Sequence, residues 1–151
     1  MHISAKTDYA VRAMLIIAEG RGGRVKAEDL ALAQGLPRKF LESILGELRR
    51  AGLVASWRGP DGGFVLGRDA ADISVADVMR AVDGPLAEVR GLRPEQTVYT
   101  GTAEPLGAVW VAVRASLRAV LEAVTIAHIL DGPLPDAVTG LTSDPDAWLS
   151  R

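Results

Sequence analysis

The chain has 151 residues, of which 48% are apolar and only 5% aromatic, and its net charge is −2. The apolar content is sufficient for a packed core, so we expect one domain, or a small domain with an oligomerisation arm, rather than a disordered chain. The sequence contains no cysteine, which excludes disulfides, thiolate nucleophiles and cysteine-ligated zinc or iron–sulfur centres. It also has no apolar run of membrane-spanning length and no signal-peptide pattern, so we expect a cytoplasmic protein.

Charge is distributed unevenly along the chain. Residues 1–68 hold 11 Lys and Arg against 7 Asp and Glu, a balance of +4, whereas residues 69–151 hold 6 against 12, a balance of −6. A basic first half and an acidic second half fit a DNA-binding module joined to a part that avoids phosphates. A chance fluctuation of this size is not rare, so charge alone decides little.

The first half of the chain predicts three helices. Ser4 is a suitable N-cap for a helix over 6–19 whose apolar residues return on one face. A second helix is expected over 26–34, with Gly35 in the left-handed conformation at its end. The third, over 38–51, is the strongest helical prediction because apolar residues repeat at three- and four-residue spacing.

A β-hairpin is expected after the third helix. Leu53–Trp57 and Phe64–Leu66 have the composition of short strands, and the GPDGG turn between them contains Gly62 and Gly63, either of which can supply a positive φ. Three helices followed by a hairpin is the layout of a winged helix-turn-helix. We therefore predict a mainly α fold with a small β-wing.

A capping box marks the last helix of this winged domain. Ser74 followed by Asp77 predicts a short helix that ends near Val82. The winged domain would therefore span residues 1–85. Residues 86–105 lack a hydrophobic period and are expected to form a loop.

The helix expected over 106–124 carries a long apolar stripe. A small winged domain needs less apolar surface to cover its own core, so much of this stripe is expected to pack against a second copy of the chain. A short helix capped by Thr125 would complete a dimerisation segment over 106–131, and residues 132–151 would form a loosely held tail. The predicted interface residues are Leu106, Val109, Trp110, Val113, Leu117, Val120, Leu121 and Val124.

The third helix is the candidate recognition helix. In a helix-turn-helix, the N-terminal residues of this helix contact base edges in the major groove. Arg38 or Lys39 could donate to guanine and Glu42 could accept from a cytosine amino group, although a solvated helix face would show the same residue types. The predicted DNA-facing residues of this helix are Arg38, Lys39, Glu42 and Ser43 near its start, and Arg49 and Arg50, which suit phosphates, near its end.

Two further basic positions are candidates for DNA contact. Arg58, beside Gly59, lies at the tip of the expected wing, where an arginine suits a narrow minor groove, and the alternative is an ordinary exposed hairpin charge. Lys6, at the start of the first helix, could contact a phosphate.

The signal to which such a protein responds is left open by the residues. Trp57, Tyr99 and Trp110 could line an effector pocket between the winged domain and the dimer helix, or they could simply be core and interface aromatics. A partner protein, or no signal at all, is also compatible with the sequence. No serine nucleophile elbow, P-loop or HExxH motif is present, so we predict no catalytic site, no metal site and no enzyme activity.

Four motifs carry a family resemblance: KTDYAVRAML (6–15), ALAQGLPRKFLESILGELRRAGLVAS (31–56), RGPDGGFVLGRD (58–69) and ISVADVMRAVDGP (73–85). In this order and spacing they resemble the Rrf2-type bacterial winged-helix transcription regulators, from Ser4 to about Leu130. The resemblance implies a homodimer in which the 106–124 helices pair and two heads bind a palindromic site. It also implies base reading near Arg38–Glu42 and minor-groove insertion by Arg58.

The resemblance breaks down at the cofactor. Many members of the family hold an iron–sulfur cluster on three cysteines in the stretch that corresponds to residues 86–105, and this chain has none there. A histidine that serves as a further ligand in some relatives would fall near Gly107. Asp8 falls where certain relatives use an acidic ligand, but one carboxylate cannot hold a cluster, and a first-turn helix position favoured by the dipole explains it. We therefore expect no cofactor.

These observations predict a homodimeric regulator that binds specific duplex DNA and represses transcription by occluding a promoter. The alternative is a winged-helix module that docks a partner protein, because the fold is used for both purposes. The presence of Arg38 and Lys39 on the same face as Arg58 would favour DNA, because a protein-docking wing would more often expose apolar residues there.

Overall fold

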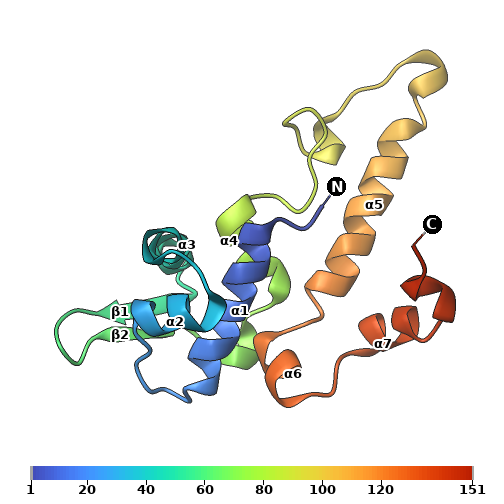
Figure 1. The fold of residues 1–151 in the computed structure, drawn as a ribbon. Coiled ribbons are helices and arrows are strands. Elements are labelled where there is room, and N and C mark those ends of the chain that lie inside the picture. The colour runs from blue at the N-terminus through green and yellow to red at the C-terminus, as the bar shows by residue number, and fades with distance from the viewer. Residues whose placement is uncertain (1, 151) are drawn as a thin grey trace.

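The computed structural model describes residues 2–150 and shows a winged helical head from which one long helix stands apart (Figure 1). The helices and strands are α1 (Ala5–Glu19), α2 (Ala27–Gln34), α3 (Arg38–Arg50), β1 (Val54–Trp57), β2 (Gly63–Leu66), α4 (Val75–Asp83), α5 (Leu106–Leu121), α6 (Ile126–Asp131) and α7 (Asp136–Thr142). Short 3-10 helices lie between them at η1 (Ala70–Asp72), η2 (Pro94–Gln96) and η3 (Gly101–Ala103), and a further one, η4 (Pro145–Trp148), follows α7. The predicted mainly α fold with a small β-wing is confirmed.

The core of the head is enclosed by α1, α3, α4 and α6. The apolar spacing in α3 aligns four side chains on one face, and all four are fully buried: Leu41, Ile44, Leu45 and Leu48. Each such burial contributes about 1.5–3 kcal/mol relative to an exposed position. The amphipathic pattern of this helix therefore fixes which side faces the core and leaves its polar side outward.

Local capping signals set the helix ends as the sequence predicted. Ser4 caps α1, and Gly35 ends α2 in the left-handed conformation with φ 63°. Ser74 and Asp77 form a reciprocal capping box at α4, with the two hydrogen bonds at 3.0 and 3.1 Å. Thr125 caps α6.

The wing is an antiparallel hairpin in which Val54 faces Leu66 and Trp57 faces Gly63. Positive φ occurs at Gly63, as one of the two predicted alternatives, and also at Gly59, with values of 148° and 98°. Gly62 serves a different need, because a side chain there would collide with the carbonyl oxygen of Trp57. The turn therefore requires glycine at three positions for two separate reasons.

Residues 84–105 run from α4 to the far end of α5, and α5 then returns to the head (Figure 1). The predicted loop over 86–105 is partly ordered into η2, η3 and a bridge between Val89 and Leu92. η2 packs against α5. After α5, α6 packs against α1, so α5 is linked to the same head at both ends.

The end of α5 and the tail differ from the prediction. α5 ends at Leu121, and Val124 is only 7% exposed within the head, where its carbonyl accepts a hydrogen bond from Val75 at 2.8 Å. The assignment of Val124 to the dimer interface is therefore wrong, because this residue already fills the core of its own head. The tail is less loose than predicted, because residues 136–142 form α7, which packs against α5.

None of the helices formed within residues 2–150 has both the length and the apolar character needed to cross a bilayer.

Candidate nucleic-acid interface

The amphipathic sequence of α3 buries its apolar side in the core and leaves its polar side facing outward. Arg38, Lys39, Glu42 and Ser43 are all exposed near the start of the helix. Phe40, between them, is supported from behind by Tyr9, whose ring meets it edge-on with a centroid distance of 6.1 Å. The helix is therefore held by its apolar side while its first turns are free to meet another molecule.

A groove of about 490 Å³ separates α3 from the wing. Five of the nine residues predicted to bind DNA line this groove: Arg38, Glu42, Arg49, Arg58 and Gly59. Lys26 and Glu28, at the start of α2, line it as well and were not predicted. Four cationic side chains thus face two carboxylates in one concave surface, which gives the groove a positive balance.

The Arg38 and Glu42 side chains, both predicted to read bases, bind each other in the free protein. The Nε of Arg38 donates to Glu42 Oε1 at 2.8 Å, and Glu28 lies 3.7 Å from the same guanidinium. The hydrogen bond with Glu42 raises the pKa of Arg38 above its ordinary value. Both side chains remain well exposed, at 63% and 45%, so this pair lies open to exchange with an incoming ligand.

The wing is braced by a residue that sequence reasoning missed. Arg24 donates to the carbonyl of Asp61 at 2.9 Å and lies over the Trp57 ring, 5.0 Å from its centroid. Val25 forms an isolated antiparallel bridge with Phe64 next to this contact, outside the two-stranded hairpin. The β-branched Val25 between charged residues was the only sequence signal for this bracing.

The remaining basic residues divide into free and engaged side chains. Among residues 2–150, neither Lys39 nor Arg58 has a side-chain hydrogen bond or ion pair. Arg49 donates to Ser56 Oγ at 3.3 Å, and Arg50 lies 4.0 Å from Glu47. These last two contacts are exposed and leave both guanidinium groups accessible at the end of α3.

Lys6 does not fit the phosphate contact predicted for it. Its ammonium lies 2.7 Å from Glu47 Oε2 and donates to the carbonyl oxygen of Val82 at 2.8 Å, which links α1, α3 and α4. The first contact is an ion pair without hydrogen-bond alignment. Because the side chain is already engaged inside the head, we correct its role from DNA contact to a cross-link between helices.

The predicted aromatic pocket does not form. Trp57 lies in the wing, Trp110 lines a cavity beside Pro94 and Val113, and Tyr99 lies against Arg90 with the guanidinium 5.5 Å from the ring centroid. The wing and α5 lie on opposite sides of the head (Figure 1). Within one chain the three aromatics therefore do not share a pocket, and the other alternative left open by the sequence, that they are separate core and interface residues, stays a prediction.

Residues 3–132 match the model of the Rrf2 family, which is described as iron-dependent transcriptional regulators. The chain belongs to the Rrf2 family. The resemblance seen in the four sequence motifs is thus confirmed, and it extends through α5 and α6.

Named relatives and solved structures agree with Rrf2 membership. The chain is 48% identical over 145 residues to Rv1287 of Mycobacterium tuberculosis, named as an HTH-type transcriptional regulator, covering 95% of this chain and 90% of that protein. It is 44% identical over 84 residues to the transcriptional regulator IscR of Escherichia coli, covering 55% of this chain and 52% of IscR. The structure of the cysteine regulator CymR of B. subtilis superimposes with a TM-score of 0.72 at 30% identity, covering 86% of this chain and 96% of CymR. IscR of T. potens gives 0.69 at 30% identity, covering 100% and 93%.

This Rrf2-family chain is therefore a transcriptional regulator with a winged helix-turn-helix, and DNA binding follows from that class. The family is not enzymatic, so the prediction that the protein is not an enzyme is confirmed by its relatives.

The iron named in the Rrf2 family description does not fit the donor atoms of this chain. The sequence has no cysteine and the region 86–105 has no histidine, and one of its carboxylates, on Glu95, is paired with Arg114. Asp8 is paired with Arg12 on the next turn of α1 at 3.5 Å. Over the part of the chain that the structure describes, no three His, Asp or Glu side chains gather where they could hold a metal ion. We therefore derive no function from an iron centre.

Proposed function

We propose that this regulator is a homodimeric repressor that binds a palindromic DNA site and works without an iron–sulfur cluster. The observation that supports this most directly is that the start of α3 and the tip of the wing contribute cations to the same groove. In winged proteins these two elements meet adjacent grooves of the duplex. A transcriptional role would also place the protein in the cytoplasm, where a bacterial operator lies.

The proposal gives each basic residue a separate role. Lys39 and Arg38 donate to guanine in the major groove, with Glu42 and Ser43 beside them, because these side chains project from the first turns of α3. Arg58 enters the minor groove from the wing, where the negative potential is strongest. Arg49 and Arg50 meet phosphates near the end of α3.

Reading bases requires the Arg38–Glu42 pair to open. Both side chains are exposed to solvent, so water and ions already compete with the attraction between them. Guanine and cytosine edges offer each side chain a replacement partner of the correct polarity. The pair therefore keeps the two side chains extended over the groove without preventing recognition.

Dimerisation would cover the apolar side of α5. No residue of α5 is fully buried in the single chain, and Val109 is 49% exposed. An apolar groove of about 490 Å³ along the helix is lined by residues from α5, α7 and the N-terminus: Ile3, Val113, Ser116, Leu117, Val120, Leu121 and Leu141. A second copy of α5 would remove this surface from water, and two heads joined in this way would match a two-fold symmetric operator.

Binding to the DNA upstream of its own gene tests the proposal. Fluorescence anisotropy should show tighter binding to that duplex than to a shuffled sequence of equal length and composition. The double variant Arg38→Ala/Lys39→Ala should lose about tenfold or more of this preference, because it removes the donors assigned to guanine. The control Arg90→Ala, on the distant loop, should retain it. Equal binding of the wild type to both duplexes would refute sequence-specific recognition.

Repression follows if the operator overlaps a promoter, because an occupied site excludes polymerase. In vitro transcription from the upstream DNA should therefore decrease as protein is added. An increase would show an activator instead.

A further inference from the structure

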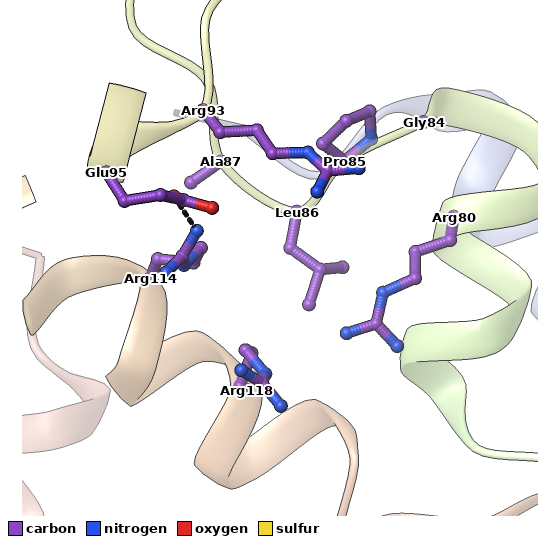
Figure 2. Close-up of a pocket in the computed structure, with 9 residues that line it drawn as sticks. All are labelled: Arg80, Gly84, Pro85, Leu86, Ala87, Arg93, Glu95, Arg114 and Arg118. Atoms are coloured by element: carbon purple, nitrogen blue, oxygen red, sulfur yellow. Dashed lines mark hydrogen bonds and ion pairs between the residues drawn. The ribbon is translucent and has the colours of Figure 1, made fainter. Parts of the chain in front are cut away.

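A cavity of about 460 Å³ lies between α4, α5 and the loop that joins them, and arginines dominate its walls (Figure 2). Arg80 enters from α4, Arg114 and Arg118 enter from successive turns of α5, and Arg93 enters from the loop. Residues 69–151 contain only six Lys and Arg against twelve Asp and Glu. Four of those six cations therefore surround a single cavity in the acidic half of the chain.

Carboxylates neutralise only part of this charge. Glu95 pairs with Arg114, and Glu122 pairs with both Arg80 and Arg118, the latter at 3.0 Å. Asp77 lies 3.9 Å from Arg80 and 4.0 Å from Arg68, so it is shared between these two arginines. Hydrogen bonds from Arg118 and Arg80 lower the pKa of Glu122, so it stays ionised. When Arg68 is counted, three carboxylates stand against five guanidinium groups, which leaves two positive charges without a counterion.

Arg93 is the least constrained of the four. Among residues 2–150 it has no ion-pair partner within contact distance, although its charge helps to lower the pKa of Glu95, after a backbone hydrogen bond and the contact with Arg114. Figure 2 shows its side chain extending from the loop toward Pro85. The Arg93 guanidinium is thus available to an incoming group.

The cavity also has an apolar wall. Pro85, Leu86 and Ala87 line it, and the Leu86 side chain projects into the space between Arg80 and Arg118 in Figure 2. An apolar surface beside convergent cations excludes water from part of a ligand while the cations fix its orientation. A volume of this order suits a small metabolite.

We infer that this cavity binds a small organic polyanion, one that carries at least two carboxylate or phosphate groups. Guanidinium groups form paired, planar hydrogen bonds with either group, which explains the choice of arginine at all four positions. Two anionic groups match the two uncompensated charges. The ligand would touch α4 of the head and α5 together. The claim concerns binding alone and stands independently of the proposed DNA function.

Isothermal titration calorimetry of the full chain tests the site, with citrate and pyrophosphate as the two probes and ionic strength held constant. We expect saturable binding of at least one probe, with one molecule per chain, and none of acetate at the same concentration. The probe that binds identifies whether carboxylates or phosphates are preferred. Absence of saturable binding for both would overturn the inference.

Matched variants locate the binding. Arg93→Gln should weaken binding about tenfold, the loss expected for one charge-assisted hydrogen bond. Arg90→Gln removes the same charge from the same loop but lies over Tyr99 outside the cavity, so it should bind like the wild type. Equal weakening by the two variants would show non-specific charge attraction and refute the site. Because no DNA is present, failure here would leave the proposed repressor function untouched.

Discussion

Salt dependence of DNA binding offers a quantitative test of the proposed interface. Each head presents three exposed cations that the proposal places near the duplex backbone or in the minor groove: Arg49, Arg50 and Arg58. A dimer would therefore displace about six condensed counterions, and the plot of log affinity against log salt should have a slope of about −5. Raising salt from about 50 to about 200 mM should then weaken binding by a factor on the order of 10³.

Arg58→Ala should make this slope shallower by about 2, because one counterion is lost from each of two heads. The measurement is fluorescence anisotropy on the same duplex at five or more salt concentrations. Arg90→Ala changes the net charge of the chain equally but lies on the distant loop, so its slope should equal that of the wild type.

The reasoning would be refuted in either of two ways. A wild-type slope shallower than about −2 would mean that the cations of the groove do not meet phosphates. An unchanged slope for Arg58→Ala would mean that the wing stays away from the duplex.

Three other predictions concern stability and assembly. Leu45→Ala should lower the free energy of unfolding by about 2–5 kcal/mol in denaturant titrations, because Leu45 is fully buried; a loss below about 1 kcal/mol would contradict this packing. Burial tends to raise the pKa of Asp83, but hydrogen bonds from Ser4 and Thr7 outweigh this effect and hold the pKa below its ordinary value of 3.8. The ionised Asp83 therefore stabilises the fold above pH 3.8, and this contribution is lost as pH falls through the lowered pKa. Asp83→Asn should therefore flatten the acid limb of the stability curve, and an unchanged limb would exclude Asp83 as its source. Val113→Glu places a carboxylate on the apolar side of α5 and should yield monomers in sedimentation velocity. The control Ala112→Glu, on the exposed side of the helix, should remain dimeric. A dimeric Val113→Glu variant would argue for a different interface.

The elements of the head were predictable because their signals are local. The α3 pattern, the Ser74–Asp77 box and the Thr125 cap each lie within a few residues, and each agrees with the tertiary fold. The groove was predictable for the same reason, because α3 and the wing are consecutive in the chain.

The errors arose where partners are distant in sequence. Lys6 is engaged by Glu47 and by the carbonyl of Val82, and no window around Lys6 contains either residue. Val124 continues the apolar period of α5 but lies beyond its last turn, because the chain turns back into the head there. The apolar period shows which residues are apolar, but it does not show whether they pack inside the head or at an interface.

The arginine-lined cavity could not be predicted from the sequence for a related reason. Its four cations are spread over residues 80–118 and come from two helices and a loop. Each looks like an ordinary surface charge in sequence. Only the return of the loop along α5 brings them together.

The attachment of α5 to the head has a mechanical consequence. At the C-terminal end of the helix, backbone hydrogen bonds from Val75 to Val124 and from Ile126 to Ile73 form a fixed pivot on the head. The other end is reached only through the irregular residues 84–105 and lies about 24 Å away, the length of sixteen helical residues. A rotation of α5 by a few degrees about this attachment would move its far end by a few ångströms, and the packing of η2 and α7 against the helix opposes that rotation. In a dimer joined through α5, the spacing between the two heads would depend on this angle.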